Sequence, residues 1–161
     1  MPSKVYKARY EDLPRQLRYG GAFGESAVVM DGAILKFAWG KPVPVAMTGR
    51  AAEAGKPDVH PWDQLMLMLK GKVEVTLGEN GDLGTWEVAA GEFIYIPSNV
   101  PHIGRTLGDE EAVGVEIFAP VREDYLDMAE HQLAYERGEA PAPSGPRDMP
   151  VKAAEAVPAA E

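Results

Sequence analysis

Between residues 28 and 118 the chain alternates short apolar runs with turn-forming residues. Runs rich in Val, Ile and aromatic residues that end at Gly, Pro, Asn or Asp are typical of β-strands. Asp31-Gly32 lies between two such runs and indicates a tight hairpin. The spacing of the turns predicts an all-β sandwich or barrel, with a further hairpin about Gly108-Asp109-Glu110. The expected strands are residues 28–30, 33–38, 43–47, 65–69, 73–77, 86–88, 93–96, 104–107 and 112–118.

The run Leu65-Met66-Leu67-Met68-Leu69 is apolar at every position, which predicts a strand covered on both faces. Because side chains alternate along a strand, the two methionines share the face of Gln64 and are expected to fill the interior. The three leucines face outward and would form an adhesive patch. N-terminal strands, a C-terminal helix or another subunit can cover them, and we expect a homodimer.

The pattern changes after Pro120, where apolar residues are spaced as on one face of a helix that Gly138 is placed to end. From Gly138 to Glu161 the chain is rich in Ala, Pro and Glu and has almost no large apolar residue. Such a segment cannot bury enough surface to offset its ordering entropy. The expected organisation is an N-terminal extension (1–27), a barrel (28–120), a C-terminal helix (121–137) and a flexible tail or dimer arm (138–161).

Composition excludes several classes of function. The 161 residues make one domain, or one domain plus a tail, and 16 Lys and Arg against 25 Asp and Glu give a net charge of −9. This balance argues against a nucleic-acid binder. The chain has no cysteine, so disulfides and thiolate metal sites are excluded. No apolar run is long enough to span a bilayer and no signal peptide is evident, so we expect a cytoplasmic protein that acts on a small molecule.

The chain has only three histidines, and two of them lie beside expected strands. Asp58, His60 and Gln64 are separated by even numbers of residues, so on a strand their side chains point to the same face and can converge on one interior point. His102 from a neighbouring strand would complete a small coordination sphere there. Two imidazoles with oxygen donors suit Zn, Fe(II), Ni, Mn or Co. Spacing alone equally allows ordinary hydrogen-bonded histidines, a turn-forming Asp58 and a structural Gln64.

Two segments resemble the sequence motifs of cupins. Asp58-Val-His60-Pro-Trp-Asp-Gln64, continuing to Gly71, resembles the first motif, in which His-x-His and an acidic residue precede a strand that ends in Gly. Gly91-Glu-Phe-Ile-Tyr-Ile-Pro-Ser-Asn-Val-Pro-His102 resembles the second motif. The resemblance implies a double-stranded β-helix, a small jelly-roll barrel whose interior holds a divalent metal ion.

Within cupins, three details look like the pectin-degradation family that linearises unsaturated monouronates. These are Gln64 in place of the usual Glu, Asn-Val-Pro-His ending at His102, and the segment Glu116-Ile-Phe-Ala-Pro-Val-Arg-Glu-Asp-Tyr-Leu126. This resemblance implies that Glu116 takes the place of the catalytic Asp and that Phe118 and Arg122 face the substrate. The Gln also resembles that of some cupin hydroxynitrile lyases, so it does not select one chemistry.

The chain departs from this family at Asp58, where the first metal-binding histidine falls. A carboxylate can replace imidazole, but it adds negative charge and lowers the Lewis acidity of the metal. Alternatively Asp58 does not bind the metal, and three protein ligands leave more open positions.

Three further residues are candidates for substrate contacts, and each has an ordinary alternative. Trp62 can stack on a sugar ring or cap the barrel mouth, and Tyr95 can contact the substrate or simply pack. Arg105 can hold an anion or lie exposed on its strand. His131 falls on the expected helix and is interpreted as a surface residue.

The leading functional hypothesis is a metal-dependent lyase or isomerase acting on a small hydroxy, keto or sugar acid. The metal acts as a Lewis acid, Glu116 moves a proton, and Arg122 pairs with a substrate carboxylate. An Fe(II)-dependent dioxygenase is the alternative if Asp58 is a ligand. A non-catalytic binding protein with a degraded metal site is the third hypothesis, which the missing first histidine supports.

Overall fold

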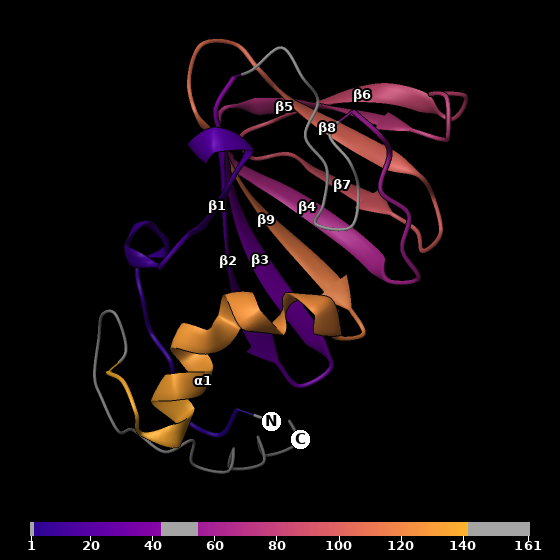
Figure 1. Ribbon diagram of the computed structural model, residues 1–161. Helices are drawn as coiled ribbons and strands as arrows, with labels where there is room; N and C mark the ends of the chain where they lie inside the picture. The colour runs from indigo at the N-terminus through magenta and orange to yellow at the C-terminus, as the bar shows by residue number, and fades with distance from the viewer. Residues whose placement is uncertain (1, 43–54, 142–161) are drawn as a thin grey trace, which may run out of the picture.

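The computed structural model describes residues 2–42 and 55–141, which form two antiparallel sheets that face each other (Figure 1). The larger sheet has the strand order β1-β2-β3-β9-β4-β7, and the smaller has the order β6-β5-β8. The strands are β1 (Gln16–Arg18), β2 (Phe23–Met30), β3 (Ala33–Gly40), β4 (Asp63–Lys70), β5 (Lys72–Leu77), β6 (Gly84–Ala89), β7 (Phe93–Ile96), β8 (His102–Leu107) and β9 (Ala112–Ala119). The helical elements are the 3-10 segments η1 (Tyr10–Asp12), η2 (Tyr19–Gly21) and η3 (Glu123–Ala129), and the α-helix α1 (Glu130–Arg137).

The all-β class predicted from the turn pattern is confirmed, as is the first hairpin. Met30 pairs with Ala33 around Asp31-Gly32, and Gly32 has a φ of 82°, which favours glycine. The expected strand at 43–47, most of the loop at 48–57 and nearly all of the tail lie outside the described residues.

The larger sheet begins earlier than residue 28. Strand β2 starts at Phe23 and pairs with β1, so residues 16–27 belong to the sheet rather than to an extension. The sheet residues in this range are 16–18 and 23–27, with η2 between them. The sequence did not indicate them because Glu25 and Ser26 interrupt the apolar pattern, although both are completely buried. Their polar groups have partners inside the fold, which a hydrophobicity pattern does not show.

The hairpin expected about residues 108–110 is wrong. Strand β8 pairs with β5 in the smaller sheet, whereas β9 lies between β3 and β4 in the larger one. The turn residues there mark a crossing between sheets, as do the connections from β6 to β7 and from β7 to β8. A turn signal shows where a strand ends, but it does not show which strand its neighbour will pair with.

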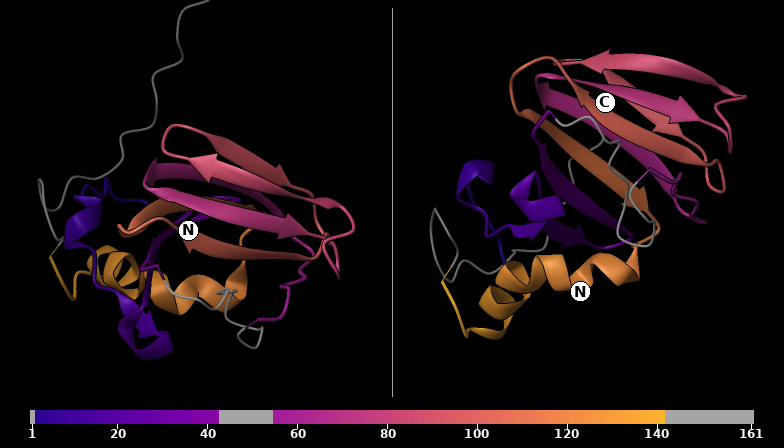
Figure 2. Two further views of the ribbon diagram at one scale, coloured as in Figure 1. Left: turned by 90° about the horizontal axis from the view of Figure 1, so that it is seen from above. Right: turned by 45° about the horizontal axis from the view of Figure 1, so that its top comes forward.

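The core lies between the two sheets and continues beneath the helical segment. Met66 and Met68 point inward with Gln64, as predicted from the strand parity. The single helix expected over 121–137 is instead η3 followed by α1, which ends at Gly138 with a φ of 77°. This segment packs on β2 and β3 through Tyr125, Met128 and Ala129 (Figure 2), on the same inward face of the larger sheet as Lys36. No helix among the described residues is long and apolar enough to cross a membrane.

The outer face of the larger sheet is covered over only part of its width. Leu13 packs there on Trp39 and Val113, so the N-terminal segment covers β3 and the start of β9. On β4 and β7, by contrast, Leu67 lies opposite Phe93, which is 66% exposed. The outward stripe of leucines predicted from the sequence is therefore exposed in the described part of the chain.

Candidate metal centre

Backbone hydrogen bonds join the two segments that carry the histidines. Asp58 and His102 form an isolated antiparallel bridge, in which each amide donates to the other's carbonyl at 2.8 and 3.0 Å. The amide of Asn99, a residue with a φ of 62°, donates to the carbonyl of His60 at 2.7 Å. The tight turn before β8 is thereby attached to the segment that leads into β4, which fixes the two imidazoles beside each other.

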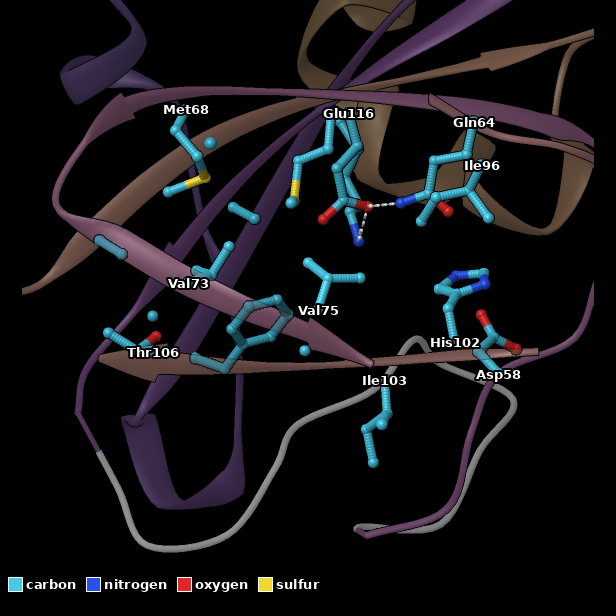
Figure 3. Close-up of a pocket in the computed structure, with 18 of the residues that line it drawn as sticks. Asp58, Gln64, Met68, Val73, Val75, Ile96, His102, Ile103, Thr106 and Glu116 are labelled. Carbon is cyan, nitrogen blue, oxygen red and sulfur yellow. Dashed lines mark hydrogen bonds and ion pairs between the residues drawn. The ribbon is translucent and has the colours of Figure 1, made fainter. Parts of the chain in front are cut away.

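Asp58, His60 and His102 each direct one potential ligand atom into a common space. These three atoms all lie within 4.8 Å of one another, and the two imidazole centroids are 4.9 Å apart. Figure 3 shows Asp58 and His102 beside Gln64 at one end of the cavity, with Glu116 next to Gln64. The structure thus brings together the four residues that the sequence suggested as ligands.

Both imidazoles are oriented by a backbone carbonyl. Nδ1 of His60 lies 3.0 Å from the carbonyl of Trp62, and Nδ1 of His102 lies 2.9 Å from that of Val100. Because a carbonyl only accepts, each Nδ1 carries the hydrogen, and Nε2 of a neutral ring keeps its lone pair for a cation. Burial lowers the pKa of His102 by more than its bond to Val100 raises it, which favours this neutral form.

The amide of Gln64 is held at both ends. Its Nε2 donates to Oε2 of Glu116 at 3.3 Å, which directs its Oε1 to Nε2 of His60 at 3.0 Å. An amide oxygen and an unprotonated ring nitrogen are both acceptors, so a proton or a metal ion must lie between them. Because Asp58 and His102 supply two further potential ligand atoms at the same point, the four residues form a candidate metal site.

The donor set fits a divalent ion of the borderline class. Two imidazole nitrogens with amide and carboxylate oxygens suit Zn, Fe(II), Ni or Mn. Asp58 is also paired with Arg122, whose Nη1 lies 3.4 Å from Oδ2. Since a carboxylate has two oxygens, this contact leaves the other oxygen of Asp58 for a cation.

The ligand cluster opens into a cavity of about 100 Å³ between the sheets. The predicted catalytic Glu116 and substrate-side Phe118 both line this cavity. The Phe118 ring is buried edge-on against His60, at 5.4 Å between centroids. The site therefore combines a cation-binding end, a carboxylate and an aromatic wall.

Arg122 also lines the cavity, but its donors already contact carboxylates of the chain. It is 1% exposed, and besides Asp58 it contacts Asp124 at 3.1 Å through Nε. Burial opposes the charge, yet Tyr125 and the two carboxylates outweigh it and raise the pKa of Arg122. In this arrangement Arg122 holds Asp58, and a substrate carboxylate would have to compete with it.

Two expected substrate contacts lie on outer faces. Tyr95 alternates outward on β7 opposite Leu65, is 53% exposed and is not among the residues that line the cavity. Arg105 is among the residues that line the cavity, but its guanidinium pairs with Glu74 at 2.8 Å on the exposed face of the smaller sheet. Side-chain alternation cannot be counted through the turn between Tyr95 and His102, so the sequence did not predict which way the Tyr95 side chain points.

Trp62 and His131 each have neighbours that the sequence did not indicate. The partly buried Trp62 packs on the core beneath the helical segment, with Arg122 5.0 Å from its ring centroid, which matches the capping alternative. His131 was expected at the surface, but it is half-buried between Tyr6 and Ser26, at 2.6 and 3.2 Å. Burial lowers the pKa of His131.

Sequence reasoning missed a buried lysine in the site. Lys36 is 3% exposed, and its Nζ lies 2.8 Å from Glu116 and 3.3 Å from Glu25. Burial opposes its charge, but Glu116, Tyr125 and Glu25 outweigh this effect and raise the pKa of Lys36. The sequence did indicate that Lys36 is buried, because Lys36 alternates in step with Ile34 and Ala38 and therefore points to the same inward face of its strand.

The comparisons with known proteins agree with this architecture. Residues 47–118 match the family model of the Cupin domain, and no curated protein matches the chain.

Similar solved structures include KdgF from Halomonas sp., with 16% identity and a TM-score of 0.56 over 72% of this chain and 95% of that one. An RmlC-like cupin from Shewanella frigidimarina NCIMB 400 has 15% identity and a TM-score of 0.58 over 78% and 99%. A mutant of Bacillus subtilis oxalate decarboxylase OxdC has 21% identity and a TM-score of 0.54 over 73% and 30%. At these identities the likeness shows the fold alone, and it confirms the double-stranded β-helix that the motifs implied.

Proposed function

We propose that this small cupin-fold protein binds a divalent metal ion through His60, His102, Gln64 and Asp58, and that it is a lyase or isomerase acting on a small hydroxy, keto or sugar acid. The main support for metal binding is that two hydrogen-bond acceptors, Nε2 of His60 and Oε1 of Gln64, lie only 3.0 Å apart. A proton or a metal ion must separate their lone pairs, and the further ligand atoms of Asp58 and His102 at the same point favour the metal ion. The reaction class rests on the residues that surround this point.

The metal ion, when bound, would polarise a carbonyl or hydroxyl oxygen of the substrate. Glu116 is the group placed to move a proton, since its carboxylate lines the cavity and its side chain is 14% exposed. Both of its described contacts, from Lys36 and Gln64, fall on Oε2. Among the described residues this leaves Oε1 to take a proton from a substrate carbon and to return it.

The charges around the cavity support an anionic ligand. Lys36 lies between Glu25 and Glu116, and Arg122 lies between Asp58 and Asp124. Arg18 also pairs with Glu25, so three basic side chains stand against four acidic ones, a sum of −1. A bound dication would change this sum from −1 to +1, and the excess positive charge favours a ligand with a carboxylate. The cavity volume of about 100 Å³ suits a small acid.

The experiment is to purify the protein without added metal, determine its metal content, and incubate it with small hydroxy and keto acids in D₂O. Proton NMR would show exchange or loss of the hydrogen next to the carboxylate or carbonyl. We expect close to one equivalent of metal and exchange of that hydrogen in at least one acid. Metal below about a tenth of an equivalent would favour a non-catalytic binding protein, because a working site retains its ion.

One observation keeps an oxidative alternative open. The carboxylate of Asp58 lies with the two imidazoles, which approaches the two-His-one-carboxylate arrangement of Fe(II) oxygenases. Oxygen uptake by the Fe(II)-loaded protein, without hydrogen exchange in D₂O, would select this function over the lyase or isomerase.

We also propose that the protein is a homodimer. The support is the outward stripe on β4 and β7, where Leu65 lies opposite Tyr95 and Leu67 lies opposite Phe93. Large apolar side chains that gather on one exposed face mark an interaction surface.

A further inference from the structure

We propose that Lys36 is a positioning residue of the metal centre, and that it acts through Glu116 to fix which end of the Gln64 amide faces the cation. Nζ of Lys36 and Nε2 of Gln64 both contact Oε2 of Glu116, at 2.8 and 3.3 Å. The opposite end of the amide is the oxygen that faces His60. This inference rests on the metal binding proposed above.

The sheet register places these groups in one row. On the inner face of the larger sheet, Lys36 of β3 lies directly opposite Glu116 of β9. Glu116 in turn lies opposite Met66 of β4, and Gln64 is the next inward residue on that strand. The contacts therefore follow from strand pairing and do not depend on a loop.

The ammonium group of Lys36 is held from its other side as well. Nζ lies 3.3 Å from Oε1 of Glu25, whose Oε2 lies 3.4 Å from Arg18. Glu25 is completely buried, so water cannot replace it as a partner of Lys36. The row of contacts thus leads from Arg18 on β1 through the buried pair to the amide beside His60.

The two ends of a glutamine amide have nearly the same shape, so electrostatics decides which end faces which neighbour. A carboxylate accepts hydrogen bonds, and it therefore selects the NH₂ end of Gln64. Lys36 supplies the positive charge that makes a buried carboxylate tolerable at this position. Removal of this charge leaves Glu116 without its cation, and the amide loses the partner that directs its oxygen to the metal.

The test measures Co²⁺ affinity by chelator competition in the full chain, together with the side-chain NH₂ signals of Gln64 in ¹⁵N NMR, assigned by their loss in Gln64→Ala. Lys36→Met should weaken Co²⁺ binding roughly 10- to 100-fold, the usual effect of losing an outer partner of a ligand. It should also shift the NH₂ signals. Lys36→Arg, which keeps the charge, should restore a large part of the affinity. Lys72→Met removes an exposed lysine paired with Glu87 and should change neither measurement.

Lys36→Met leaves two buried carboxylates near each other, which opposes folding, so a second variant is needed. The double variant Lys36→Met/Glu116→Gln removes one charge of each sign and leaves Glu25 paired with Arg18. It should show the same loss of Co²⁺ affinity, because a neutral amide at 116 does not select the NH₂ end of Gln64. If wild type binds no Co²⁺, the proposed function fails. If wild type binds and the folded variants match it in affinity and NH₂ signals, only the role of Lys36 is rejected.

Discussion

Arg122 and Asp58 form a buried ion pair, with 3.4 Å between Nη1 and Oδ2, beside the two imidazoles of the candidate metal centre. The pair shows how a carboxylate is accommodated there, since Arg122 balances its charge inside the fold. It also gives Arg122 a role that does not require a substrate.

The first prediction concerns the stability that this pair provides. Arg122→Met leaves Asp58 buried without its cation, and we expect the free energy of unfolding to fall by about 3 kcal/mol. Asp124→Asn removes the more exposed partner of Arg122, and we expect it to cost under about 1 kcal/mol. Urea unfolding of the metal-free protein measures both. Equal losses would show that Asp124, and not Asp58, is the main partner of Arg122.

The second prediction separates the three histidines. His60→Ala and His102→Ala should each abolish stoichiometric metal binding, because each removes one of the converging ligand atoms. His131→Ala should retain it, since His131 contacts Tyr6 and Ser26 outside the cavity. Metal content after dialysis, with thermal unfolding to confirm that each variant is folded, gives the answer. Retention of metal in His60→Ala or His102→Ala contradicts the proposed centre.

The sequence predicted the architecture and the ligand cluster because both depend on local patterns, namely side-chain alternation along strands and two short motifs. Strand parity is local, so Gln64, Met66 and Met68 could be assigned to the interior from alternation alone. The two motifs then identified the strands that bring His60 and His102 together.

What the sequence did not predict depends on partners far apart in the chain. Alternation along the strand indicated that Lys36 faces the core, but its partner Glu116 could be known only from the strand register. The expected hairpin failed for the same reason, because pairing between sheets is decided by the whole fold. His131 was assigned to the surface because its neighbours on the N-terminal segment and on β2 could not be known.

The third prediction is a pH dependence of stability in the metal-free protein. Burial lowers the pKa values of His102 and His131 below their usual 6.5, so the unfolded chain binds more protons than the folded chain in this range. Stability is therefore fully present above pH 6.5 and is lost as the pH falls through the folded-state values. Urea unfolding at pH 7.5 and at about pH 5.5 should show the decrease. His131→Gln should make the decrease smaller, and an unchanged slope would mean that His131 is not the titrating group.

The fourth prediction concerns Tyr125, whose hydroxyl is buried and has no hydrogen-bond partner among the described residues. An unsatisfied buried hydroxyl destabilises a fold, so Tyr125→Phe should leave the free energy of unfolding unchanged or raise it by about 1 kcal/mol. The ring would keep its edge-on contact with Phe118 at 5.4 Å. Thermal unfolding of the metal-free variant measures the change. A clear loss of stability would show that the hydroxyl has a partner after all.

The fifth prediction tests the homodimer. We expect light scattering at micromolar concentration to give twice the chain mass of 17.4 kDa. Leu67→Glu places a charge in the middle of the stripe on β4 and β7, opposite Phe93, and should produce a folded monomer because a buried unpaired carboxylate disfavours association. Leu83→Glu changes an exposed leucine outside that stripe and should remain dimeric. A wild-type monomer would exclude the dimer, and a Leu67→Glu dimer would place the interface on another surface.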